Sequence, residues 1–146
     1  MIAQTIESDH DAGKEVFAVV GNAAQPAWDE RGREMEALAR LWTVHGVMLD
    51  RAVFPRLGDV GPLAEELRAL QRRVQEMAAD LAHRAQQQHD ADGRWLTDFE
   101  ALKRLFDEQC LREDVALVPL IRDRVAPEDV AEMTRAARAL RQARAA

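Results

Sequence analysis

Hydrophobic residues recur at steps of three and four along most of this chain, and no stretch alternates in the way that a β-strand does. Between about residues 62 and 88 the stripe is wholly apolar, with Leu63, Leu67, Leu70, Val74, Met77 and Leu81. This spacing gives a helix one apolar face, which has to be buried against other helices. The pattern therefore predicts an all-α fold.

Four clusters of glycine or proline beside aspartate or asparagine predict connections, at residues 21–26, 58–62, 90–93 and 126–129. They separate helical segments over about residues 5–20, 28–57, 62–88, 94–124 and 127–144. Four long helices with short connections favour an up-down-up-down four-helix bundle, against which a short fifth helix packs. Pro55 and Pro119 lie late in two long segments, where we expect them to kink or end the helix.

Composition and charge narrow the range of partners. Apolar residues make up 47% and charged residues 32% of the 146 residues, which is typical of one soluble domain, here expected over residues 1–146. The single cysteine and the absence of a recognisable signal peptide or membrane span predict a cytoplasmic protein that does not contact a membrane. The net charge of −6 argues against a nucleic-acid partner.

Polar side chains interrupt the apolar stripes at four positions, namely His10, His45, Gln109 and Glu113. A buried carboxylate is costly unless a cation or a hydrogen-bond donor meets it. Two histidines and one glutamate from three helices have the composition of a two-His-one-carboxylate metal site. The spacing leaves a second interpretation open, in which these residues are ordinary core or boundary residues without a metal.

Three segments carry a resemblance to a known family: DHDAGKEVF (9–17), HGVMLDRAVFPRL (45–57) and DGRWLTDFEALKRLFDEQCLREDVALVPLI (92–121). In this order they resemble the hemerythrin-like HHE cation-binding domains, over nearly the whole chain. The paired endings FPRL and VPLI are the most specific feature, since each proline follows the expected family histidine by ten residues. The resemblance implies a four-helix bundle that holds non-heme iron.

Three ligand positions of the family pattern are retained. The histidines of the first and second helices fall on His10 and His45, and the carboxylate of the fourth helix falls on Glu113. In the family these two histidines hold the same iron, so the resemblance implies one metal ion here, with iron preferred and zinc suited to the same ligands. Three ligands leave open positions for water or for a diatomic molecule such as dioxygen or nitric oxide.

The nitrogen ligands of the family's second iron are missing, together with one bridging carboxylate. The bridging glutamate of the second helix falls on Leu49, the third-helix histidine falls most naturally on Leu67, and the fourth-helix histidine falls on Gln109. The two leucines would fill the vacated space with hydrocarbon, which argues against a di-iron centre. We expect Gln109 to hydrogen-bond whatever occupies the cavity.

The loss of half the ligands leaves a metal-free hypothesis open beside the single-metal one. In that case the chain is an interaction or regulatory module on a degenerate hemerythrin scaffold, whose remaining polar groups bond one another. The expected partner is a small molecule, at the metal or in the vacated cavity. The stripe over residues 130–140 either supports a homodimer or packs on its own bundle. No motif predicts an enzyme, although none rules one out.

Other chemically capable side chains have simpler interpretations. His83 and His89, near the acidic residues of 80–92, are interpreted as the solvated end of a helix instead of a cation site. Cys110 follows Gln109 directly, so it points roughly 100° away from the predicted site. We interpret Cys110 as a buried small residue and not as a nucleophile, because the sequence pairs no histidine with it.

Overall fold

The computed structural model describes residues 1–23, 27–87 and 89–145, and every element within these ranges is helical. The long helices are α1 (Ile2–Gly21), α2 (Trp28–Met48), α3 (Leu63–Gln87), α4 (Trp95–Arg112) and α6 (Pro127–Ala145). The prediction of an all-α fold is confirmed. The last residues of the expected connection at 21–26, and the expected helix end at residue 88, lie outside the described residues.

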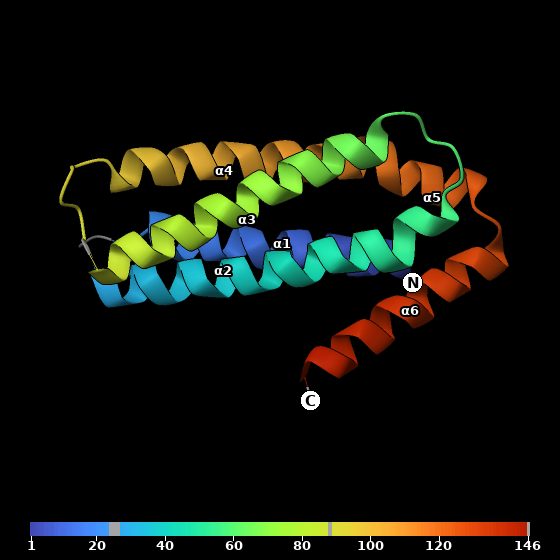
Figure 1. Cartoon of the computed structure of the whole chain (residues 1–146), viewed down its shortest axis with the longest axis horizontal. Helices are drawn as coiled ribbons and strands as arrows, with labels where there is room; N and C mark the ends of the chain where they lie inside the picture. Colours follow the sequence, from blue (N-terminus) through green and yellow to red (C-terminus); the bar gives the residue numbers. More distant parts are fainter. Residues whose placement is uncertain (24–26, 88, 146) are drawn as a thin grey trace.

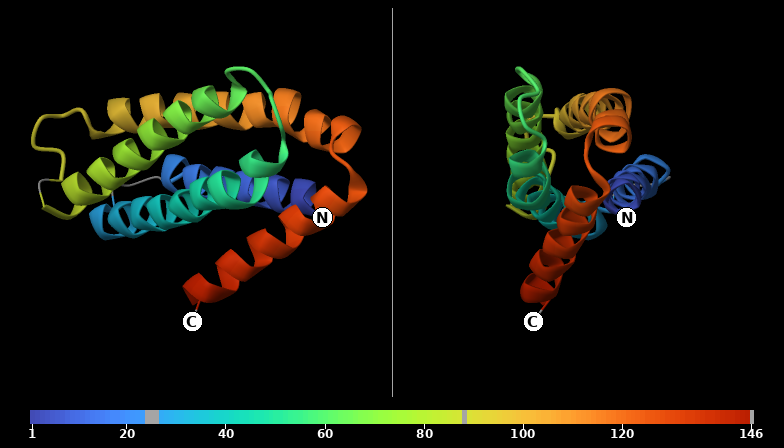
Figure 2. Two further views of the ribbon diagram at one scale, coloured as in Figure 1. Left: turned by 45° about the vertical axis from the view of Figure 1, so that its right-hand side comes forward. Right: turned by 90° about the vertical axis from the view of Figure 1, so that its right-hand side faces the viewer.

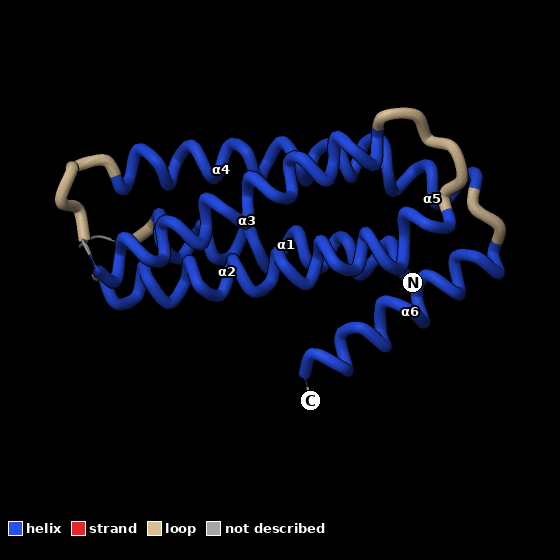
Figure 3. The backbone as a smooth tube through the Cα atoms, in the orientation of Figure 1, coloured by secondary structure: helices blue, strands red, loops and turns tan. Residues whose placement is uncertain are grey.

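Helices α1 to α4 lie lengthwise beside one another and form a helical bundle (Figure 1). Helices that follow one another in the chain pack together, α1 on α2, α2 on α3 and α3 on α4. Helix α1 ends and α2 begins at the end of the bundle where α3 ends and α4 begins, and the α2–α3 connection lies at the opposite end (Figure 3). Helix α6 lies outside the four, as the view along the bundle shows (Figure 2).

The interior consists of two apolar clusters. One is built around Phe17, Trp42 and Phe99, and the other is built around Leu49 and Leu67. Between them, every long helix of the bundle contributes buried polar side chains: Asp9 and His10 from α1, His45 from α2, Gln71 from α3 and Gln109 from α4, followed by Glu113. A single polar layer therefore crosses the bundle at one level.

The two long segments that contain prolines change helix type just before the proline. Helix α2 continues as the π-helix η1 (Leu49–Val53) and the 3₁₀ turn η2 (Phe54–Arg56). Helix α4 continues as the π-helix η3 (Glu113–Leu117) and the α-helix α5 (Val118–Arg124). A π turn holds an extra residue, which leaves room for the ring that would otherwise clash with the preceding turn. The expected helix end is confirmed at Pro55, whereas helix α5 continues through Pro119 to Arg124 after the π turn. Glu113 begins one of the widened turns.

Helix α6 was expected to be short, but it has 19 residues. Its apolar side is buried against the second cluster through Met133 and Ala137. It packs against α1, α2 and η1. The C-terminal helix therefore covers the part of the bundle where α1 and α2 carry the polar layer.

Close packing at Gly13 provides a test of the interior. An ideal Cβ at Gly13 would lie 2.6 Å from Cε2 of Phe106, whereas one at Gly21 would come no nearer than 4.0 Å to Phe99. We predict that Gly13→Ala lowers the free energy of unfolding by about 1–3 kcal/mol, because the buried ring has to shift. The control Gly21→Ala should be neutral or stabilising by up to about 1 kcal/mol. Urea denaturation measures both, and equal stability of the two variants would contradict the packing described.

Candidate metal centre

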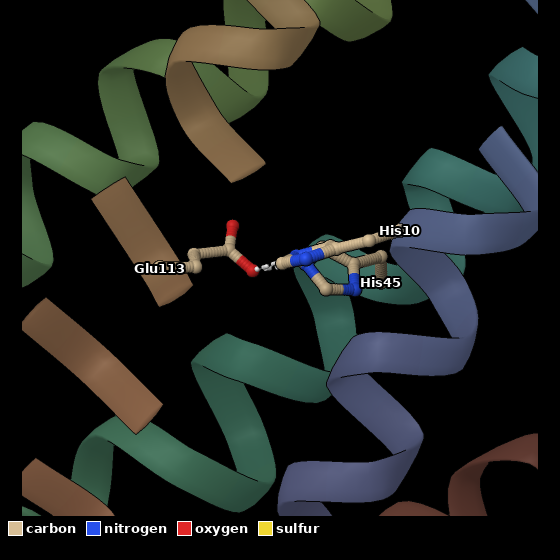
Figure 4. A group of neighbouring side chains, drawn as sticks. All are labelled: His10, His45 and Glu113. Atoms are coloured by element: carbon tan, nitrogen blue, oxygen red, sulfur yellow. Dashed lines mark hydrogen bonds and ion pairs between the residues drawn. The ribbon is translucent and has the colours of Figure 1, made fainter. Parts of the chain in front are cut away.

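His10, His45 and Glu113 point at one another in the polar layer (Figure 4). Nε2 of His10 lies 2.9 Å from Oε1 of Glu113, and Nε2 of His45 lies 2.8 Å from the same oxygen. The three side chains offer ligand atoms that all lie within 4.8 Å of one another, and all three are buried. The structure thus brings together the residues that interrupt the apolar stripes. Their role as metal ligands stays a prediction.

Local packing holds the two rings in place. His45 stacks on Trp42, which precedes it by about one helical turn, with 4.3 Å between ring centroids and 15° between the planes. His10 lies 5.6 Å from His45, measured between centroids. Side chains three or four residues apart share a helix face, so the tryptophan that packs in the first cluster also sets the orientation of His45.

The second nitrogen of each ring also faces a carboxylate. Nδ1 of His45 lies 2.8 Å from Oδ2 of Asp9, which is itself buried. Nδ1 of His10 lies 3.1 Å from Oδ1 of Asp114, an ion-pair distance, although it makes no hydrogen bond among the described residues. Histidines that bind metals usually place a carboxylate or carbonyl oxygen on the nitrogen that does not bind the ion. The surroundings of His45 match that arrangement, whereas the carboxylate beside His10 lies at ion-pair distance without a hydrogen bond.

The buried charges perturb one another strongly. Burial alone would lower the pKa of His45, but the charge of Glu113 and hydrogen bonds to Asp9 and Glu113 raise the pKa to about 9. Burial alone would raise the pKa of Glu113, but the charge of His45 and hydrogen bonds from both histidines lower this pKa to about 2. In the metal-free chain at neutral pH, His45 is therefore protonated and Glu113 is ionised.

Gln109 completes the bonding of Glu113. Its Nε2 donates to Oε2 of Glu113 at 2.8 Å and to Oε1 of Gln71 at 2.7 Å. Its Oε1 accepts a hydrogen bond from Nε1 of Trp42 at 2.8 Å. The structure therefore places Gln109 against the carboxylate and its neighbours. The expected contact between Gln109 and a bound ligand stays a prediction.

Gln71 reaches the layer because Gly46 has no side chain. Nε2 of Gln71 donates to the backbone carbonyl of Trp42 and, at 2.9 Å, to Gln75. A Cβ at Gly46 would lie 2.7 Å from the same nitrogen. The polar side chains that α3 and α4 themselves contribute to the layer, before Glu113 in the next turn, are thus neutral amides.

The positions that depart from the family pattern are filled as expected. Leu49 and Leu67 are buried in the second apolar cluster. Asp50, the acidic neighbour of Leu49, faces outward and pairs with Arg68 at 2.6 Å. Neither leucine position offers a ligand atom for a second ion.

Sequence reasoning missed several side chains that contact the centre or its neighbours, among them Asp9, Asp114 and Arg141. Asp9 was not assigned a role, although it directly precedes His10 in the DH pair. Arg141 of α6 donates to Asp9 from its Nη2 at 2.6 Å. The DH pair was an available signal for Asp9, whereas no local pattern pointed to Arg141.

The remaining sequence candidates lie away from the centre. His83 and His89 are exposed, and the His89 ring stacks on Trp28 with 5.3 Å between centroids. Cys110 is a free, buried thiol in the first apolar cluster, as expected. Burial raises the pKa of Cys110, which makes a reactive thiolate unfavourable.

Comparison of the chain with models of protein families, with curated proteins and with solved structures found no match. Among the described residues, no helix combines the length and the apolar character needed to cross a membrane.

The charges at the centre predict how the stability of the metal-free chain depends on pH. The pKa of His45 is raised from 6.5 to about 9 on folding, so its stabilising contribution is present below 6.5 and is lost as pH rises through 9. We predict that the free energy of unfolding falls by up to about 1.4 kcal/mol per pH unit across this window. Urea denaturation in the presence of a chelator measures it.

A variant without the imidazole provides the control for that prediction. His45→Gln should be less stable at neutral pH, and the alkaline slope that His45 causes should be absent, because a glutamine side chain does not titrate. An alkaline slope of equal size in wild type and in His45→Gln would show that other groups cause it.

Proposed function

We propose that this chain binds one non-heme metal ion through His10, His45 and Glu113. The observation that carries the proposal is the meeting of two imidazole nitrogens and a carboxylate oxygen, all buried, from three helical segments. Such groups are expensive to bury unless something compensates for their lost hydration, and a metal ion does so. Two imidazoles and one carboxylate suit ferrous iron, which we favour, and also suit zinc.

The surrounding groups support this choice of site. Asp9 bonds the outer nitrogen of His45, and Asp114 lies 3.1 Å from the outer nitrogen of His10, while each Nε2 contacts Glu113 at the centre. Ligand atoms around a tetrahedral zinc ion are separated by roughly 3.3 Å. The present contacts of 2.8 and 2.9 Å are therefore those of a hydrogen-bonded cluster, which has to open slightly and give up its bridging protons to admit an ion.

A single ion is proposed instead of a di-iron centre. Leu49 and Leu67 stand where the hemerythrin-like pattern has a glutamate and a histidine, and both are buried among apolar side chains. The alternating ends at which the helices connect support a hemerythrin-like up-down-up-down bundle (Figure 3). The proposed protein is thus a hemerythrin-like bundle that keeps only one of the two metal positions.

The ligand of the metal is proposed to be a very small molecule, such as dioxygen or nitric oxide. A metal with three protein ligands supplies open coordination positions, and the buried centre excludes larger molecules. A recess of about 180 Å³ between α2 and α3 is lined by Leu49, Leu67 and Gln71. Through Gln71 and Gln109 it is connected to Glu113 by hydrogen bonds. This recess is the second place where we propose that a small molecule binds.

A metal-free interaction or regulatory module is the second candidate function, and one observation favours it. Both ring nitrogens of His45 already face carboxylate oxygens, of Asp9 and Glu113, and Asp9 also pairs with Arg141. His45 is therefore fully hydrogen-bonded without an ion. Either function suits a reducing compartment such as the cytoplasm, since Cys110 is a free thiol.

Elemental analysis of the purified chain separates the two functions. We predict about one iron or zinc per chain in wild type, and loss of that metal in His45→Ala, because one of three ligands is removed. The matched control His83→Ala removes an exposed histidine and should keep the metal. Two ions per chain would contradict the proposal of a single ion. No uptake from iron(II) or zinc solutions would favour the metal-free module.

Spectroscopy tests the proposed small-molecule ligand. We predict that nitric oxide, added without oxygen to the iron(II)-loaded chain, changes its visible absorption in proportion to the iron content, because open positions remain on the metal. The His45→Ala variant should show no such change under the same conditions. An unchanged spectrum of the fully loaded wild type would mean that the ion offers no accessible position, which would remove this part of the proposal.

A further inference from the structure

The C-terminal helix is connected to the proposed metal centre by two consecutive charged contacts. Nη2 of Arg141, on α6, donates to Oδ2 of Asp9 at 2.6 Å. The same oxygen lies 2.8 Å from Nδ1 of His45. Asp9 is 4% exposed and Arg141 is 32% exposed. A helix outside the bundle thus shares a buried carboxylate with a proposed ligand.

Arg141 is also the main polar anchor for the second half of α6. The first half is held by Met133 and Ala137, which are buried in the second apolar cluster. Beyond Ala137, Leu140 is only partly buried, and Arg141 contacts Asp9 and, at 3.2 Å, Sδ of Met48. Residues 142–144 are exposed. A segment with so few buried contacts is held weakly and responds to small changes in its anchor.

A metal ion at His45 changes the charge that this anchor meets. A divalent ion places two positive charges beside Nε2 of His45, where the metal-free chain has a single proton, so the positive charge that faces Asp9 through this ring rises. Asp9 lies directly between the ring and the guanidinium, so the added charge attracts Asp9 and repels Arg141. These groups contact one another directly, and Asp9 and His45 are buried, so their charges are screened less than charges at the surface.

We propose that metal loading weakens the docking of the second half of α6, with Arg141 as the positioning residue that acts through Asp9. Because coupling between two sites is reciprocal, docked α6 weakens metal binding by the same factor. This inference rests on the proposed function, since it requires an ion at His10, His45 and Glu113. The inference extends the proposed function, because metal binding at the centre would then change the docking of the C-terminal helix.

Hydrogen exchange of the α6 amides in the full chain, with and without iron(II) or zinc, tests the coupling. We expect metal to speed exchange after Ala137 several-fold in wild type. We also expect Arg141→Gln, which removes the charge but keeps a donor, to bind metal roughly 3–10 times more tightly, an effect limited by the partial exposure of Arg141. Arg141→Lys keeps the charge and should bind metal like wild type.

Arg138→Gln is the matched control, because Arg138 is exposed on the same helix and makes no hydrogen bond or ion pair with any other described residue. It should behave like wild type in both measurements. If Arg141→Gln releases α6 altogether, its tighter metal binding is still expected, because the repelling charge has left the centre.

Two results would overturn the coupling. The first is hydrogen exchange in α6 that is unchanged or slower in metal-loaded wild type than in metal-free wild type. The second is Arg141→Gln that binds metal no more tightly than wild type. Elemental analysis distinguishes these from failure of the proposed function, in which wild type takes up no metal and both proposals fall together.

Discussion

One carboxylate oxygen, Oε1 of Glu113, is contacted by the Nε2 atoms of both His10 and His45, and the interior is organised around it. The three groups come from different helical segments, so their contact requires a fixed register between those segments. Apolar clusters on both sides enclose the polar layer. A charge that is sealed in this way has to be matched by its neighbours, because water cannot reach it.

The polar layer is divided into a charged side and a neutral side. Asp9, His10, His45 and Glu113 form the charged side, where two carboxylates meet two imidazoles. Gln71 and Gln109 form the neutral side and pass hydrogen bonds to Glu113 and to Trp42. A cation is attracted to the first side only, since amides carry no net charge. This division is the physical reason for proposing one ion in this bundle, although the family pattern that its sequence resembles has places for two.

The helical segments and three members of the centre were predictable from local pattern. The apolar period fixes which face of each helix is buried, and His10, His45 and Glu113 stood out because they occupy that face. The two prolines predicted a disturbance, but not the π turns that place Glu113 at the start of a widened turn. Local pattern carries no information about the register between distant helices. The contact of Arg141 with Asp9 spans 132 positions, and only the docking of α6 creates it.

X-ray absorption at the metal edge of the loaded chain tests the central claim most directly, because it counts and identifies the atoms that surround the ion. The account predicts scattering from two imidazole rings, further nitrogen or oxygen neighbours, and no second metal. A second metal at roughly 3.5–4 Å would contradict the single-ion centre. A sulfur neighbour, or a spectrum without imidazole scattering, would place the ion away from His10 and His45.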